Sequence, residues 1–444
     1  MRLGIIALVT SLVGVCQADE YHYKSLLVGT KAIGLGGAFT AVSDDLSGVF
    51  YNPAGLNQTT TFNSASISTF AWEKMEFKDV FSSGEDFSRS SFSIVPSFLG
   101  IGGINNDWHW SLGFAVSDLS TERNYSEISY PLLNEDSIQV GQEIQFANID
   151  LDNSALNLGL GAGFKLNPKL SVGGALILKY KKFETIQGSG VNTIAHFPEF
   201  DVTGGFSASR RLKDETILAA PSIGLIYNTP TLDIGLRLTK DFTINRAYSA
   251  THTIFVSSPT PLPPTINPAT AGTVKGSKAQ QFATNISLGF AKRLKNFEWS
   301  FDIDHFTEVD VNEFSISEFH PTITRDYDAV TNFSLGLTFY SSAQKYFRFG
   351  VFTDIANTSI DITKEFQRTE AVNMLGFSVD YTTDTFGFPI SIGAYAKYGE
   401  GQVRLADLRL VDRRVGLPLY PPSNNHDIID ATKSLMVLFI SANF

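Results

Sequence analysis

Residues 232–239 read Leu-Asp-Ile-Gly-Leu-Arg-Leu-Thr, so apolar and polar residues alternate strictly. Successive side chains of a β-strand point to opposite faces, and this segment therefore has one apolar and one polar face. The same pattern recurs along the chain as far as its last residues. A soluble sheet buries its apolar face, whereas a transmembrane barrel turns apolar residues to lipid and polar residues to a wet lumen. The number and length of the segments, and the glycines on their polar faces, favour the barrel.

Fourteen segments show this alternation. Short turns and long polar stretches alternate between them, as in outer-membrane barrels with short periplasmic turns and long outer loops. After the first 20 residues, no apolar run reaches the roughly 18 residues of a membrane-spanning helix. We therefore predict an all-β fold, a 14-stranded antiparallel transmembrane β-barrel, in residues 61–444. The expected strands cover residues 62–72, 91–102, 107–119, 141–166, 170–183, 216–227, 232–246, 279–294, 297–309, 327–340, 346–356, 370–382, 388–410 and 434–444. The expected outer loops cover residues 73–90, 120–139, 184–215, 247–278, 310–326, 357–369 and 411–433.

The two faces of each segment fix the register of the barrel. In residues 297–304, Phe, Trp, Phe and Ile alternate with Glu, Ser, Asp and Asp. A slip of one residue would place Asp302 and Asp304 in lipid. A slip in residues 346–356 would do the same to Arg348. A basic residue there costs about 2–4 kcal/mol near the midplane, and an acidic residue costs less. We expect all three side chains to face the lumen.

The first 18 residues have the pattern of a secretory signal peptide. Arg2 precedes an apolar stretch, and Cys16-Gln17-Ala18 offers small residues for cleavage. A buried N-terminal strand and an acylated Cys16 are the alternatives. Cys16 is the chain's single cysteine, so no disulfide framework or cysteine-based metal site is expected. The formal charge of −11, with no basic run, disfavours nucleic acid as a partner.

Residues 19–60 do not alternate, and they precede the first expected strand. They are rich in glycine, and Asn52-Pro53 is a turn signal. About forty residues are too few for a separate domain but enough for a plug inside the lumen. A flexible periplasmic arm is the alternative. Apolar residues argue against a freely solvated arm: Val42, Leu46, Val49, Phe50 and Leu56.

This N-terminal segment resembles the FadL/TodX family of outer-membrane transporters for long-chain fatty acids and hydrocarbons. The resemblance lies in residues 31–39, Lys-Ala-Ile-Gly-Leu-Gly-Gly-Ala-Phe, and in Asp44-Asp45 through Asn52-Pro53-Ala54. It implies that residues 19–60 form a hatch that a hydrophobic ligand displaces before leaving sideways through a kink in the third strand. By this match, the hatch or gating residues are Asn52, Pro53, Ala54, Gly36 and Gly37. The third strand has no glycine directly after Ser117, where a kink is expected.

Substrate-binding candidates come from the lumen and from the outer loops. Arg237 and Arg348 point inward and match a carboxylate bidentately. The alternative is an ordinary charged lumen, balanced by Asp233 and Glu298. The landing site that the resemblance implies would use aromatic residues of two outer loops, namely Phe197, Phe200, Phe206 and Phe255. The proline-rich stretch 257–270 indicates an extended segment in the second of these loops.

The sequence predicts a channel for passive uptake of hydrophobic molecules, with long-chain fatty acids as the first expectation. The principal alternative is a PorV-like, secretion-associated barrel that binds partner proteins, and a general porin is the third. An enzyme is disfavoured because no Gly-x-Ser-x-Gly motif appears, and neither a cofactor nor a metal is expected. The expected setting is the outer membrane of a Gram-negative bacterium, with a monomeric barrel. The expected partners are the ligand, outer-membrane lipid and lipopolysaccharide, and the barrel-assembly machinery during folding.

Overall fold

Every residue range below refers to a computed structural model of the chain. The structure describes residues 21–443, apart from residues 25, 61, 79–85, 106–107, 134–137, 198–199, 258–268, 310–313, 318–319, 324–326, 343–344, 361–368, 385–386 and 405–427. The expected signal peptide and the terminal Phe444 lie outside the described residues, as does nearly all of the proline-rich stretch. None of the described helices is long and apolar enough to cross a membrane.

An antiparallel barrel encloses the lumen, because the first strand pairs with the last, from Ser64↔Asn443 to Phe77↔Ala431. Fourteen strands of the described chain form the closed ring, which confirms the predicted fold. They are β1 (Asn63–Phe77), β2 (Phe87–Asn105), β3 (Trp108–Leu133), β4 (Gln139–Asn167), β5 (Leu170–Phe197), β6 (Phe200–Asn228), β7 (Asp233–Lys240), β10 (Thr284–Arg293), β11 (Phe297–Phe306), β14 (Val330–Ser342), β15 (Lys345–Asp354), β16 (Thr369–Asp384), β17 (Pro389–Arg404) and β18 (Ile428–Asn443). Beyond the ring, β8 (Phe242–Ser257) follows β7, β9 (Ala269–Gly276) precedes β10, and β12 (Phe314–Ser317) pairs with β13 (His320–Ile323).

The faces of the strands agree with the predicted register. Along β11, Glu298, Ser300, Asp302 and Asp304 are buried, whereas the alternate apolar residues are only partly covered. Arg348 is also buried. Apolar side chains of other strands are exposed on the outside, as in Leu236, Leu238, Phe347 and Phe349. A closed barrel with an apolar outer band is the architecture of an outer-membrane protein.

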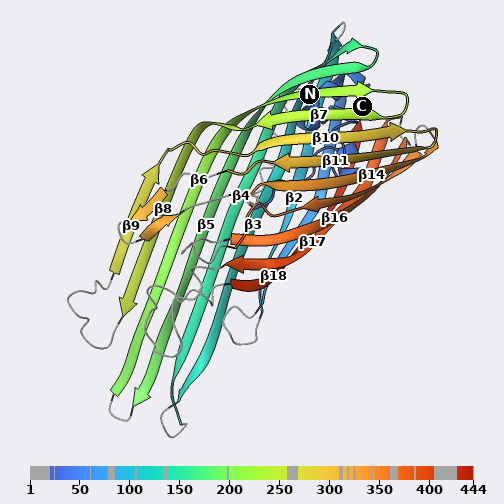
Figure 1. Cartoon of the computed structure of the whole chain (residues 1–444). Coiled ribbons are helices and arrows are strands. Elements are labelled where there is room, and N and C mark those ends of the chain that lie inside the picture. Colours follow the sequence, from blue (N-terminus) through green and yellow to red (C-terminus); the bar gives the residue numbers. More distant parts are fainter. Residues whose placement is uncertain are drawn as a thin grey trace, which may run out of the picture.

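One side of the barrel extends further than the sequence predicts. Residues 120–139, 184–215 and 247–278 were expected to be loops, but much of them continues β3, β5, β6, β8 and β9 (Figure 1). Beyond the membrane both faces of a strand are wet, so the apolar alternation stops while backbone pairing continues. Side-chain pairs connect the strands there, as where Arg211 Nε donates to Glu184 at 2.8 Å. The alternation of apolar and polar residues therefore predicts the membrane-embedded part of a strand but not its extension beyond the membrane.

We call the described part of residues 19–60 the hatch; it packs against the inner wall of the barrel and contributes part of the buried apolar core. It holds two short helices, α2 (Thr30–Gly34) and α3 (Gly48–Tyr51), and the 3-10 helix η1 (Pro53–Gln58). The Asn52 side chain caps η1 by accepting the N–H of Ala54, and Pro53 at the first position suits the helix start. Apolar hatch residues contact inward residues of β15, β17 and β18 in one buried cluster: Leu27, Ile33, Phe352, Tyr395, Leu435, Val437 and Phe439. The alternative of a freely solvated arm is therefore wrong for this segment.

Candidate functional site

Asn52 joins the hatch to the barrel wall. Its side-chain amide donates to the carbonyl of Thr40 in the hatch at 2.8 Å and to that of Leu225 on β6 at 3.1 Å. The backbone N–H groups of Phe39 and Thr40 both donate to Asp302 Oδ2 at 2.8 Å. A buried side chain that satisfies groups on both sides is costly to detach. Asn52 therefore anchors the N-terminal segment to the wall.

Glycines on the inner wall let the hatch backbone approach closely. A Cβ atom at Gly350 would lie 2.2 Å from the N atom of Gly36, and one at Gly173 would lie 2.3 Å from the carbonyl carbon of Pro53. Gly36 and Gly37 also have φ angles of 62° and 86°, where other residues are strained. Gly36, Gly37, Pro53 and the buried Ala54 thus all lie where the N-terminal segment meets the wall.

Ion pairs hold the hatch at two further places. Lys24 Nζ lies 2.5 Å from Asp304 Oδ2, and Lys31 Nζ lies 2.8 Å from Asp44 and 3.3 Å from Glu298. Burial alone would lower the pKa of Lys31, but these two carboxylates outweigh it and raise the pKa above its usual range. Lys31 therefore stays charged, and both lysines tie the hatch to acidic residues of β11.

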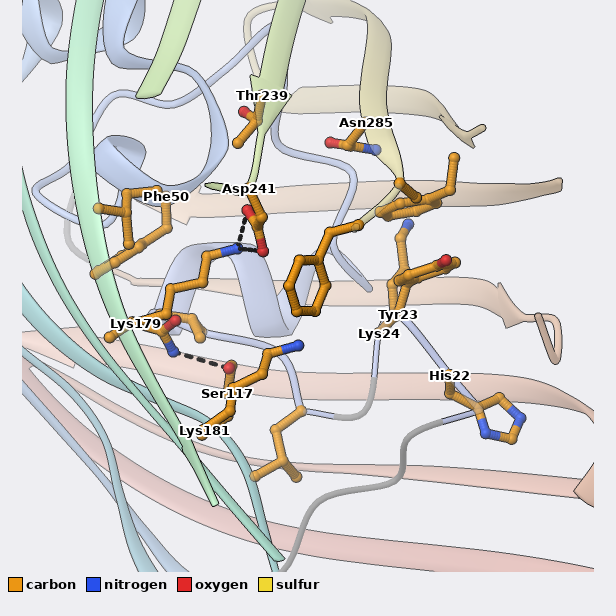
Figure 2. A pocket seen from close by; sticks show the side chains of 18 of the residues that line it. His22, Tyr23, Lys24, Phe50, Ser117, Lys179, Lys181, Thr239, Asp241 and Asn285 are labelled. Carbon is orange, nitrogen blue, oxygen red and sulfur yellow. Dashed lines mark hydrogen bonds and ion pairs between the residues drawn. The ribbon is translucent and has the colours of Figure 1, made fainter. Parts of the chain in front are cut away.

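A cavity of about 340 Å³ lies between the hatch and the upper barrel wall (Figure 2). Basic side chains line it: Lys24, Lys179, Lys181, Lys182 and Arg237. Aromatic side chains line it too: Tyr23, Phe50, Phe183, Phe282, Phe306 and Tyr327.

Contacts between the lining side chains hold the two kinds of group together. Lys179 lies 2.8 Å from both oxygens of Asp241 (Figure 2). Lys181 Nζ lies 5.4 Å from the centre of the Phe282 ring. The cavity therefore offers cations beside aromatic faces, and its size is in the range of small-molecule sites.

The barrel wall is interrupted beside this cavity. Pairing between β2 and β3 runs from Asn105↔Trp108 to Phe98↔Ala115 and ends there. The pairing of β3 with β4 shifts between Val116 and Asp118, so Ser117 is an extra, bulged residue. Leu26 of the hatch donates its N–H to the Ser117 carbonyl at 3.2 Å, and both residues line the cavity. A β-bulge at a serine thus bends the third strand where the resemblance implied a glycine.

The structure separates the two candidate arginines. Arg237 lines the cavity and donates to the Phe50 carbonyl at 2.6 Å and to Ser287 at 2.8 Å. Arg348 does not line the cavity. It is buried beneath the hatch, where it makes a bidentate pair with Asp380 at 2.8 and 2.6 Å.

The predicted partners of these arginines are corrected. Asp380 balances Arg348, and Asp304 lies 3.9 Å from Arg237. Glu298 instead lies near Lys31, and no ion pair of Asp233 appears among the described residues. Face alternation showed which residues point inward, but it did not show which of them meet.

The aromatic landing candidates lie in the extended part of the wall. Phe197 and Phe200 pair at the end of the β5–β6 hairpin, and Phe206 lies further along β6. The side chains of these three lie outside the described residues. Phe255 on β8 is 52% exposed, and it lies on the opposite face of the strand from the buried Ala250. The structure does not bring Phe255 to the cavity.

The sequence reasoning missed Lys179, Lys181 and Asp241. The lysines lie at alternate positions of β5, at the height where apolar alternation fades, and that alternation was the only available signal. Asp241 separates β7 from β8. The sequence pattern predicted one strand across both, so the break at Asp241 was not apparent.

Comparison with known proteins gives matches among solved structures. No protein-family model matches the chain, and no curated protein matches it. The chain is similar to a Pseudomonas aeruginosa FadL homologue, with TM-score 0.58, 12% identity, and 97% of this chain and 99% of that chain covered. It is also similar to the Pseudomonas putida toluene transporter TodX, with TM-score 0.57, 13% identity and coverage of 96% and 99%. The Ralstonia pickettii toluene transporter TbuX gives TM-score 0.56, 14% identity and coverage of 95% and 100%. The chain has the FadL/TodX fold, as its N-terminal motif predicted.

Proposed function

We propose that the chain is a channel of the Gram-negative outer membrane that admits hydrophobic molecules passively, as a member of the FadL/TodX family. One observation carries the proposal: a cavity with aromatic lining lies directly against the hatch and beside an interrupted wall. Residues 19–60 are the proposed hatch, and the barrel catalyses no reaction. The whole path lies inside one barrel, so the proposed working unit is a monomer.

The proposed ligand is a long-chain fatty acid. Its chain would contact the aromatic side chains, and its carboxylate would approach the basic group around Lys179, Lys181 and Arg237. Asp241 lies 2.8 Å from Lys179 and Asp304 lies 3.9 Å from Arg237, so a bound carboxylate would share these cations with the wall carboxylates. The similarity to FadL and TodX structures supports a hydrophobic ligand of either kind, and the basic lining favours the acid.

The proposed route uses the contact between Leu26 and Ser117. A ligand that fills the cavity competes with the hatch for the Lys24–Asp304 region and displaces the segment around Leu26. The carbonyl of Ser117 then loses its hatch partner, and the gap between β2 and β3 opens to the membrane. Lateral exit suits a hydrophobic ligand because it avoids the aqueous periplasm.

Uptake by whole cells tests this function. Cells that lack their own fatty-acid channel should take up oleate faster when they carry this barrel, with a smaller gain for toluene. A barrel with the hatch residues 19–60 deleted serves as the ungated control. If neither compound enters faster with the barrel than without it, the transport proposal is wrong and the secretion-partner alternative gains support.

A further inference from the structure

The barrel wall has a second interruption, five strands around the ring from the one at Ser117. Strand β7 pairs with β10 as far as Lys240↔Thr284, and β8 pairs with β9 from Tyr248↔Gly276 onward. Residues 241–247 and 277–283 therefore run side by side without backbone pairing. The register is the same on both sides of the gap, because an equal number of residues separates the two pairs on each chain. In Figure 1 a coil joins β9 to β10 at this place.

Side chains, and not a backbone ladder, hold this gap closed. Lys240 Nζ donates to the Phe282 carbonyl at 2.5 Å. Thr243 Oγ1 donates to the Gln280 carbonyl at 2.8 Å, and Arg246 Nη1 donates to the Lys278 carbonyl at 3.2 Å. Three alternate carbonyls of one edge thus depend on three side chains of the other. We call residues 241–247 and 277–283 the seam. Side chains change rotamer much more readily than strands separate, so the seam can open without unfolding the barrel.

The seam lies between the cavity and the outer surface. Asp241, Gln280 and Phe282 line the cavity, while the neighbouring Phe242 and Ile244 are 54% and 59% exposed on the outside. Both wall interruptions occur at a similar height, because β3 and β7 each pair for eight residues before the ladder stops. Eight tilted residues rise roughly 20 Å, which is the upper part of the apolar band about 25 Å tall.

We propose that the seam is a second lateral opening, through which a membrane-dissolved hydrophobic molecule passes between the outer leaflet and the cavity. The inference rests on the proposed transport function but concerns a different part of the wall. An apolar molecule in the outer leaflet reaches the cavity past Phe242 and Ile244 without crossing the polar outer extension. The hatch backbone bonds to Ser117, whereas side chains of the wall hold the seam, so the two places can open independently.

Quenching by lipid tests the opening without relying on transport. Single cysteines replace Gln280, Leu238 or Thr239 in a chain with Cys16→Ser, and each carries a bimane fluorophore in liposomes with acyl-brominated phospholipid. Leu238 and Thr239 are adjacent on β7, and they face lipid and lumen respectively. We expect the probe at Gln280 to be quenched as strongly as the probe at Leu238. Protection equal to that at Thr239 would overturn the proposal.

A disulfide across the seam tests whether the opening is used. Thr243→Cys with Gln280→Cys spans the seam, and Leu238→Cys with Ile286→Cys spans the continuous ladder just below it. Oxidation should lower oleate uptake in the first variant, with recovery on reduction, and leave the second unchanged. Equal uptake by both oxidised variants would contradict a transport role for the seam. Quenching at Gln280 together with no oleate uptake by any barrel would leave the opening established and the transport function refuted.

Discussion

Gly173→Ala should force the hatch from its seat and increase the ion conductance of the barrel. The new Cβ atom would lie 2.3 Å from the carbonyl carbon of Pro53 and 2.4 Å from the N atom of Ala54. Both obstacles are backbone atoms of a buried segment, so no flexible side chain can move aside. Overpacking of this kind costs about 1–3 kcal/mol, and detaching the hatch relieves it. Single-channel recording in planar bilayers measures the result.

The neighbouring Gly174→Ala is the matched control. A Cβ atom there would meet its nearest atom, the Ser222 carbonyl oxygen, only at 4.0 Å. We expect this variant to conduct as poorly as the parent barrel. Heat-modifiable migration on gels would show that both variants are folded. Equal, low conductance of the two alanine variants would mean that the hatch does not occupy the wall against β5.

Arg237→Met should weaken binding of a fatty acid much more than binding of its methyl ester. Arg237 lines the cavity, and a charge-assisted contact contributes roughly 1.5–3 kcal/mol. The expected loss for the acid is therefore about ten- to a hundredfold in affinity. Arg237 also holds the Phe50 carbonyl of the hatch, and this structural loss affects acid and ester alike. The difference between the two ligands, measured by titration calorimetry on the detergent-solubilised barrel, isolates the carboxylate contact.

Arg348→Met is the matched comparison for Arg237. Arg348 is occupied by Asp380 beneath the hatch and does not line the cavity. Its loss leaves Asp380 buried without its cation, so the hatch seat weakens, but acid and ester should change equally. If Arg237→Met also changes both ligands equally, the cations of the cavity serve the hatch and not a head group.

The barrel could be predicted from the sequence because lipid imposes a simple pattern on it. Each membrane-embedded residue of a strand faces either lipid or lumen. The apolar Trp299 and the acidic Asp302 therefore show by residue type which face of β11 they occupy. The extended parts of β3, β5 and β6 carry no such pattern, because water bathes both faces. Local sequence therefore did not distinguish those extensions from loops.

The site was only partly predictable because its contacts join distant parts of the chain. The hatch motif around Asn52 was found from its resemblance, since its residues are contiguous. The Lys24–Asp304 pair depends on how the hatch rotates inside the barrel. The seam could not be predicted for a similar reason. Whether a strand edge is paired depends on the strand beside it, which its own sequence does not determine.

The central claim is that a movable hatch controls passage through the barrel. A disulfide between Leu26→Cys and Val116→Cys tests it most directly, since these side chains pack together beside the interruption at Ser117. With Cys16→Ser in the background, oxidation should reduce oleate uptake to the level of cells without the barrel, and reduction should restore it. Uptake that is the same in the oxidised and reduced states would contradict a hatch-controlled path.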